Sequence, residues 1–164
     1  MKTLRKRRKQ FKTDYGKRIK LLKSHSPRIV FRKTNKYVMG QYAFSKEAQD
    51  TVNFGFSSKK LLDFGWPKEF QNSLKSIPAS YLLGFLVGTK IKKEKLEKPI
   101  VDFGMNKMLH KTKVYAFLKG LLDSGIDLKT KKDIFPEEEK LRGKYLKKDF
   151  TPHFELIKSN IEKA

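Results

Sequence analysis

Near the start of the chain, apolar and polar residues alternate with the period of two that is typical of β-strands. Residues 28–32 place Ile29 and Phe31 on one side of a strand and two arginines on the other. A polar turn leads into residues 37–44, and the alternation returns in residues 52–56. Consecutive strands with short links predict an antiparallel meander of three strands.

Helical periods replace this alternation in the middle of the chain. Pro78 opens the clearest helix, whose apolar stripe runs to Ile91, because proline is tolerated in a first helical turn. Gly84 and Gly88, four residues apart, would let this helix lie close to a sheet. Shorter helices are expected at 13–22, 57–64, 112–125, 136–142 and 154–162, and short apolar strands at 100–103 and 126–128.

The order of these elements is three strands, helix, strand, helix and strand, which predicts an α/β fold. A strand–helix–strand crossover requires parallel pairing, so the sheet should be mixed, with helices packed on it. We divide the chain into a basic arm with a short helix (1–24), an α/β core domain (25–128) and a charged C-terminal extension (129–164). Residues 1–12 should be disordered in the free protein, because a dense run of cations repels itself.

Charge is distributed very unevenly along the 164 residues. Residues 1–36 hold 15 Lys+Arg and one acid, whereas the other 24 basic and 16 acidic residues leave only +8 of the net +22. A net charge so far from zero favours a polyanionic partner, either a nucleic acid or an anionic membrane surface.

Several classes of protein fit this sequence poorly. The absence of cysteine excludes disulfides and thiolate metal sites, and it suits a reducing cytoplasm. No signal peptide is expected, because the basic N-terminus leads into more charge. The longest apolar run without a charged residue, 76–89, has 14 residues, where a membrane span needs about 20.

Catalysis finds little support in the residues. The triplet Asp102-Phe103-Gly104 matches the magnesium-binding triplet of protein kinases, but no glycine-rich phosphate loop precedes it. A metal-dependent nuclease or RNA-modifying enzyme with Asp102 as a metal ligand is the alternative function. The histidines at 25, 110 and 153 show no ligand spacing. We therefore predict no catalytic residue, no metal site and no cofactor.

Cations interleaved with core positions beyond the N-terminal tail favour RNA binding. Basic side chains would contact phosphates, while a few aromatic and amide side chains would meet unpaired bases. A general binder of DNA or anionic membrane remains a further alternative. Trp66, in a turn beside Gly65 and Pro67, either packs or makes an exposed contact. The candidate RNA contacts are Arg5, Lys6, Arg7, Arg8, Lys9, Lys12, Thr13, Tyr15, Arg18, Lys23, Arg28, Arg32, Lys33, Asn35, Lys36, Gln41 and Trp66.

Two segments carry a family resemblance. Residues 12–24, KTDYGKRIKLLKS, resemble the N-terminal signature of the archaeal and eukaryotic ribosomal proteins that bind 5S rRNA. Residues 27–38, PRIVFRKTNKYV, resemble the first hairpin of the same family, whose bacterial counterpart is the eighteenth protein of the large subunit. The similarity continues in order through 64–66, 78–84, 101–104, 119–125, 136–143 and 152–154.

The resemblance implies a three-layer α/β domain with a mixed sheet, similar to the ribonuclease-H-like arrangement but without its catalysis. It also implies contacts with 5S rRNA, large-subunit rRNA and neighbouring ribosomal proteins in the central protuberance of a cytoplasmic ribosome. The chain length is that of the archaeal members. Two loops depart from the family pattern: Lys75-Ser76-Ile77 stands where Gly-Asn-Thr is frequent, and residues 105–111 lack the expected Pro and Gly.

Overall fold

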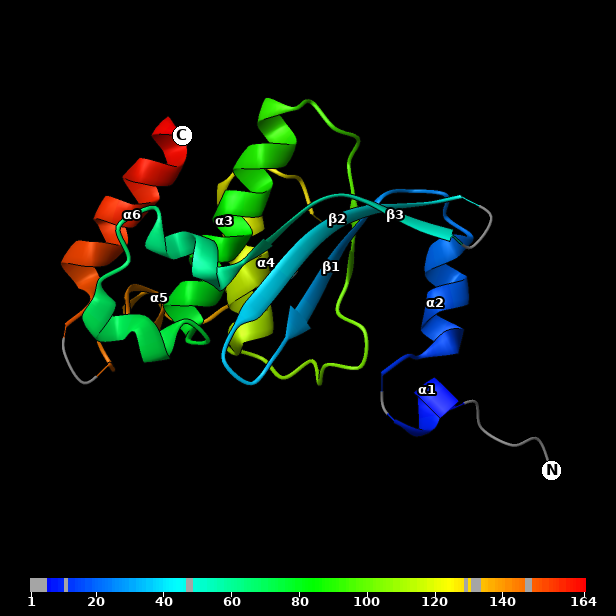
Figure 1. Ribbon diagram of the computed structural model, residues 1–164, viewed down its shortest axis with the longest axis horizontal. Helices are drawn as coiled ribbons and strands as arrows, with labels where there is room; N and C mark the ends of the chain where they lie inside the picture. The colour runs from blue at the N-terminus through cyan, green and yellow to red at the C-terminus, as the bar shows by residue number, and fades with distance from the viewer. Residues whose placement is uncertain (1–5, 11, 47–48, 129, 131–133, 147–148) are drawn as a thin grey trace.

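A computed structural model describes residues 6–10, 12–46, 49–128, 130, 134–146 and 149–164 (Figure 1). Its centre is a four-stranded sheet in the order β3-β2-β1-β4. β1 pairs antiparallel with β2 and parallel with β4, and β2 pairs antiparallel with β3, so the predicted α/β fold with a mixed sheet is confirmed. The strands are β1 (Arg28–Lys33), β2 (Val38–Lys46), β3 (Gln49–Ser57) and β4 (Ile100–Asp102).

The two faces of the sheet have different surroundings. Ile29 and Phe31 are fully buried in the core that the sheet shares with two helices. Alternate residues of β1 point to the opposite face, here called the outer face. Val30 on this face pairs with Gln41 of β2 and Asp102 of β4. The outer face therefore carries charged and amide side chains, as the arginine alternation predicts.

The core face is covered by α3 (Ile77–Lys93) and α4 (Lys113–Asp123). Ser76 caps α3 by accepting a hydrogen bond from the Ala79 N–H at 3.4 Å. Gly84 and Gly88 of α3 lie against α4 and its end, and not against the sheet as the sequence predicts. A Cβ on Gly84 would overlap the Phe117 carbonyl of α4, so these glycines allow close packing between two helices rather than between helix and sheet.

The predicted strand at 126–128 is absent, and the end of α4 explains the signal. Gly125 adopts φ +97°, its N–H donates to the Leu122 carbonyl, and the Ile126 N–H donates to the Leu121 carbonyl. This is a Schellman ending, in which an apolar residue after the glycine packs back on the helix. Ile126 is 8% exposed, so its apolar character reflects this contact and not a strand.

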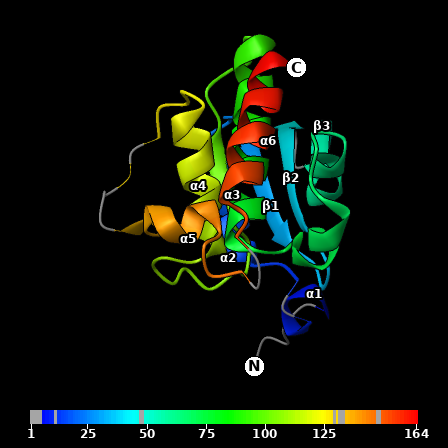
Figure 2. The same cartoon turned by 90° about the vertical axis from the view of Figure 1, so that its left-hand side faces the viewer.

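The C-terminal part of the chain adds to the core. It contains α5 (Glu138–Arg142) and α6 (Thr151–Lys163), and α6 lies alongside α3 (Figure 2). Phe150, Phe154, Ile157 and Ile161 are buried there. The short 3-10 helices η1 (Ser58–Leu62) and η2 (Lys68–Ser73) bring Trp66 to the same cluster.

Trp66 is a core residue. It is 3% exposed, its ring centroid lies 4.5 Å from that of Phe150, and its Nε1 donates to the Phe70 carbonyl at 3.0 Å. Both the apolar ring and the N–H are thus satisfied inside the protein. This corrects its inclusion among the candidate RNA contacts.

The N-terminal arm forms α1 (Lys6–Lys9) and α2 (Tyr15–Leu22), to the right of the sheet in Figure 1. Of residues 1–12, for which the charge run predicts disorder in the free protein, residues 6–9 form α1, and residues 1–5 and 11 lie outside the described residues. No residue of α2 is buried and Ile19 is 55% exposed, so the expected apolar contact of this helix with the domain is not made by Ile19. No helix in the described ranges is long and apolar enough to cross a lipid bilayer.

Candidate nucleic-acid interface

Asp14 organises the arm by capping α2. Its carboxylate accepts hydrogen bonds from the backbone N–H groups of Gly16 at 3.1 Å and Lys17 at 3.3 Å. Arg8 of α1 also approaches it, with Nη1 3.1 Å from Oδ2. The Lys17 N–H is the largest influence on the pKa of Asp14, and with Arg8 it holds that pKa below its ordinary value. The single acid of the basic segment therefore ties the two arm helices together.

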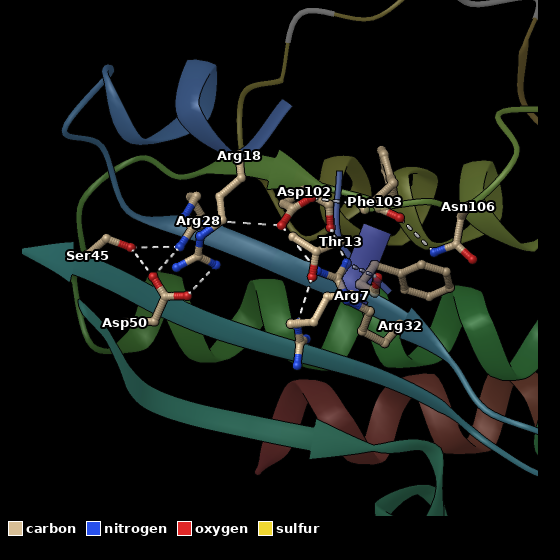
Figure 3. Close-up of polar contacts among 12 residues, drawn as sticks. Arg7, Thr13, Arg18, Arg28, Arg32, Ser45, Asp50, Asp102, Phe103 and Asn106 are labelled. Atoms are coloured by element: carbon tan, nitrogen blue, oxygen red, sulfur yellow. Dashed lines mark hydrogen bonds and ion pairs between the residues drawn. The ribbon is translucent and has the colours of Figure 1, made fainter. Parts of the chain in front are cut away.

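Arg28 lies at the centre of an ion-pair network on the outer face (Figure 3). Its Nη2 donates to Asp50 and to the Ser45 hydroxyl, both at 2.6 Å, and its Nη1 lies 3.8 Å from Asp102. Asp50 also pairs with Arg18 of α2 at 2.9 Å, which joins the arm to the sheet. Arg28 is 2% exposed, so burial removes it from the candidate RNA contacts and gives it a structural position instead.

Asp102 is held by cations and by the backbone. Arg32 Nη2 lies 3.3 Å from its Oδ2, and the Gly104 N–H donates to its Oδ1 at 2.7 Å. In the described part of the chain, no group of three or more His, Cys, Asp or Glu side chains is arranged to hold a metal ion. Asp102 is therefore part of the ion-pair network rather than of a metal site. The name ion-pair network here covers Arg18, Arg28, Arg32, Ser45, Asp50 and Asp102.

Asp50 shows how strongly the network favours charge. Partial burial by itself would raise the pKa of Asp50. The Ser45 hydroxyl and the guanidinium groups of Arg18 and Arg28 outweigh it, so the pKa lies below its ordinary value. The carboxylate is therefore ionised whenever the network is intact at neutral pH.

The arm cations surround a small pocket beside this network. Arg7 Nε donates to the Thr13 hydroxyl at 3.0 Å, and Arg8 Nη1 lies 3.4 Å from the Met105 sulfur. Lys6, Lys9 and Lys12 are exposed, as is Lys23 at the end of α2. Tyr15 is half-buried, and Arg5 lies outside the described residues. The pocket, of about 110 Å³, is lined by Arg7, Lys12, Thr13, Asp14, Lys17, Arg18, Arg32, Asp102 and Gly104.

The remaining candidates lie along the first hairpin. Lys33, Asn35 and Lys36 are exposed at the turn between β1 and β2, and Gln41 is half-buried on the outer face. Asn35 and Lys36 also line a larger groove of about 750 Å³, here called the hairpin groove. Its lining is Asn35, Lys36, Tyr37, Gln71, Asn72, Ser73, Lys75, Ser76, Ile77, Lys113 and Tyr145.

Most residues that line the hairpin groove are not predicted from the sequence to lie together. Lys75, Lys113 and Tyr145 come from segments far apart in the chain, and only the fold brings them beside the hairpin. Lys75 Nζ donates to the Asn35 carbonyl at 3.3 Å, and the Ile77 N–H donates to the Tyr145 hydroxyl at 3.2 Å. Apart from Asn35 and Lys36, the sequence signal is the departure from the family pattern at residues 75–77, which marks the loop without revealing its neighbours.

Comparison with known proteins identifies the family. The family described as "Ribosomal large subunit proteins 60S L5, and 50S L18" matches residues 1–100. The "Large ribosomal subunit protein uL18" of Korarchaeum cryptofilum (strain OPF8) is 40% identical over 141 residues, covering 85% of this chain and 70% of that protein. The chain belongs to this family of large-subunit ribosomal proteins.

Membership settles the broad class of function. This is a family of structural proteins of the ribosome, in the cytoplasm, and not of enzymes. The nuclease alternative is thereby set aside, and Asp102 has the structural surroundings described above. The exposed cations of this ribosomal protein are accordingly its candidate contacts with rRNA.

Proposed function

We propose that this ribosomal protein binds 5S rRNA and attaches it to large-subunit rRNA in the central protuberance, beside other ribosomal proteins. The observation that carries the proposal is the arrangement of the arm. Its exposed cations stand on two short helices that Asp14 and Arg18 fasten to each other and to the sheet. A charged segment fixed in this way presents its cations together rather than as a loose tail.

The chemistry of these side chains suits an RNA backbone. Lysine and arginine neutralise phosphates and release counterions, which makes affinity fall steeply with salt. Backbone contacts position a protein without selecting sequence, so selectivity for 5S rRNA would come from the shape of its helices and loops. Asn35 and Gln41 would then contact unpaired bases. We also propose that the domain has the ribonuclease-H-like arrangement that the resemblance implies. The chain would divide after residues 24 and 128 into the arm, the core domain and the C-terminal extension.

The test is binding of the full chain to 5S rRNA, to transfer RNA and to a scrambled RNA of the 5S length, across a salt series. The arm variant carries Arg7→Gln, Lys9→Gln and Lys12→Gln. We expect tighter binding to 5S rRNA than to either control RNA. The arm variant should lose about 2 to 3 from the slope of log affinity against log salt, since each phosphate contact contributes roughly 0.7 to 0.9.

A matched control removes three exposed lysines elsewhere, with Lys93→Gln, Lys95→Gln and Lys163→Gln. This variant has the same net charge as the arm variant, so a slope close to that of the unchanged chain would assign the effect to the arm. Equal affinity of the unchanged chain for all three RNAs would overturn specific 5S binding and leave a generic basic binder. Equal losses in the two variants would overturn the role of the arm.

A further inference from the structure

We propose that the hairpin groove is a second RNA site, which holds the backbone phosphates of a single-stranded segment and contacts its bases. The inference deepens the proposed rRNA-binding function and rests on it. It adds a site of different construction from the arm, on residues that the sequence alone does not connect. The RNA segment can come from 5S rRNA or from large-subunit rRNA, and the experiment below separates the two sources.

The first support is the construction of the groove. Its walls are the β1–β2 turn, η2, the start of α3, the start of α4 and Tyr145. Its volume is about 750 Å³. The contact between Lys75 and the Asn35 carbonyl links two walls directly. The groove is thus a formed feature of the fold and not a gap beside a loose loop.

The second support is the charge of the groove. Lys36, Lys75 and Lys113 line it, and none of the described lining residues is acidic. In the described part of the chain, no carboxylate forms an ion pair with any of the three. Ile77 and Lys113 are the first residues of α3 and α4, so the positive ends of two helix dipoles add to the lysines. Such a surface favours an anion.

The pKa of Lys113 agrees with this geometry. Burial lowers this pKa most, and the neighbouring ammonium groups of Lys75 and Lys33 lower it further. The protein thus holds a lysine where its charge is disfavoured in the absence of a ligand. A phosphate in the groove would offset the repulsion, because an opposite charge within about 4–6 Å favours the charged form.

The third support distinguishes RNA from a simple anion. The lysines share the groove with amide side chains of Asn35, Gln71 and Asn72 and with the half-exposed ring of Tyr145. Amides can hydrogen-bond to base edges and to 2′-hydroxyls, and a tyrosine ring can stack on an unpaired base. A site for inorganic phosphate alone would need only the cations. Phosphate, base and ribose contacts together describe a single-stranded RNA segment.

The hairpin groove is separate from the arm. No residue lines both the hairpin groove and the arm pocket. Figure 1 shows α1 and α2 to the right of the sheet and the turn between β1 and β2 at its lower left. Two basic sites on different parts of one domain can hold two RNA segments at once.

The experiment uses the full chain with Lys36→Gln, Lys75→Gln and Lys113→Gln, the groove variant. Its affinities for 5S rRNA and for a full-length large-subunit rRNA transcript are measured over a salt series. Three single-strand contacts predict a slope smaller by about 2 and an affinity roughly 50-fold lower at 0.15 M salt, on one of the two RNAs. A loss on 5S rRNA assigns the groove to that molecule, and a loss on the transcript alone makes the protein a bridge between two RNAs.

The control with Lys93→Gln, Lys95→Gln and Lys163→Gln has the same charge as the groove variant. If both variants keep the slope of the unchanged chain on both RNAs, the groove proposal is overturned even where 5S specificity persists. If the unchanged chain shows no 5S specificity but the groove variant still loses slope, the proposed function fails and the groove stands.

A measurement on the unchanged chain guards against misfolding of the variant. Amine-reactive labelling with and without each RNA should show protection of Lys36, Lys75 and Lys113, while Lys93 and Lys163 stay reactive. Full labelling of the three groove lysines in the bound complex would overturn the proposal independently of any substitution.

Discussion

The ion-pair network on the outer face and the hairpin groove are both rich in cations, but their cations face different partners. Arg28 lies against Asp50 and Asp102 and is 2% exposed. Lys113 lies among other lysines in a groove that no described acid lines. Positive charge therefore has two uses in one small domain. Charge paired inside the protein supports the fold, and charge left without a carboxylate is available to a ligand.

Removing the centre of the network should have the largest effect on stability. Arg28→Met leaves Asp50 and Asp102 without their buried partner, so we expect the free energy of unfolding to fall by about 3–5 kcal/mol. Urea unfolding at pH 7 measures it. Arg32→Met is the control and should lose less, because the Arg32 side chain is 40% exposed and that of Arg28 is 2% exposed, although both pair with Asp102. Equal losses in the two variants would contradict the structural role of Arg28.

Asp50→Asn should have a smaller effect that depends on pH. We expect a loss of about 1–3 kcal/mol near pH 7, because the hydrogen-bonded charge is removed. The folded-state pKa of Asp50 is lowered, so its stabilisation is complete above the unfolded pKa of about 4 and is lost as pH falls through the folded pKa. Unfolding curves between pH 7 and pH 2 should therefore converge with those of the variant.

Asp63 provides the matched control for this pH dependence. Its ion pair with Lys60, at 2.8 Å, is exposed on both sides. Asp63→Asn should cost less than about 1 kcal/mol at pH 7. If it changed the acid-dependent part of stability as much as Asp50→Asn, the difference between the network and an ordinary surface pair would be lost.

The arm depends on a cap whose loss we rank third. Asp14→Ala removes the acceptor for the Gly16 and Lys17 N–H groups and should destabilise α2. Faster amide exchange in α2 measures this directly, and affinity for 5S rRNA should fall severalfold because binding must then order the helix. Asp14→Ser keeps a cap without the charge, so it should restore slow exchange. No rescue by serine would mean that the pair with Arg8, and not the cap, holds the arm.

The sequence predicts the helices and strands of this fold better than it predicts the contacts between them. Period-two alternation locates β1 and β3, and Pro78 with its apolar stripe locates α3. These signals are local, because strand and helix periods are set by residues a few positions apart. The apolar residue at 126 misleads because a helix ending and a short strand leave the same mark in the sequence.

Charge patterns show the same limit. The alternation correctly places Arg28 on the outer face, yet an arginine on an open face and one enclosed by carboxylates look identical in sequence. The deciding partners, Asp50 and Asp102, lie 22 and 74 residues further along the chain and meet Arg28 only when β1 is paired. The hairpin groove is harder still to predict, since its lysines lie on two separate loops and at the start of α4. Whether a cation stabilises the fold or binds a ligand depends on whether a carboxylate pairs with it. That pairing is set by the fold and cannot be seen in the sequence.

The smallest change offers the sharpest contrast with Arg28. Lys113→Gln should lower RNA affinity only about fourfold at 0.15 M salt, the effect of one single-strand phosphate contact. Its stability should stay the same or rise slightly at pH 7, because the lowered pKa of Lys113 means that folding disfavours its charge below that pKa. A cation at the first residue of α4 also opposes the helix dipole.

Arg28→Met and Lys113→Gln should therefore have opposite effects, measured by urea unfolding and RNA titration on the same samples. Arg28→Met should lose stability while its folded fraction keeps RNA affinity, and Lys113→Gln should keep stability while losing affinity. Lys163→Gln, which removes an exposed charge that does not line the groove, should change neither by more than the measurement error. If Lys113→Gln were destabilised and its RNA affinity unchanged, this lysine would support the fold. The distinction between paired cations, which stabilise the fold, and unpaired cations, which bind RNA, would then be wrong.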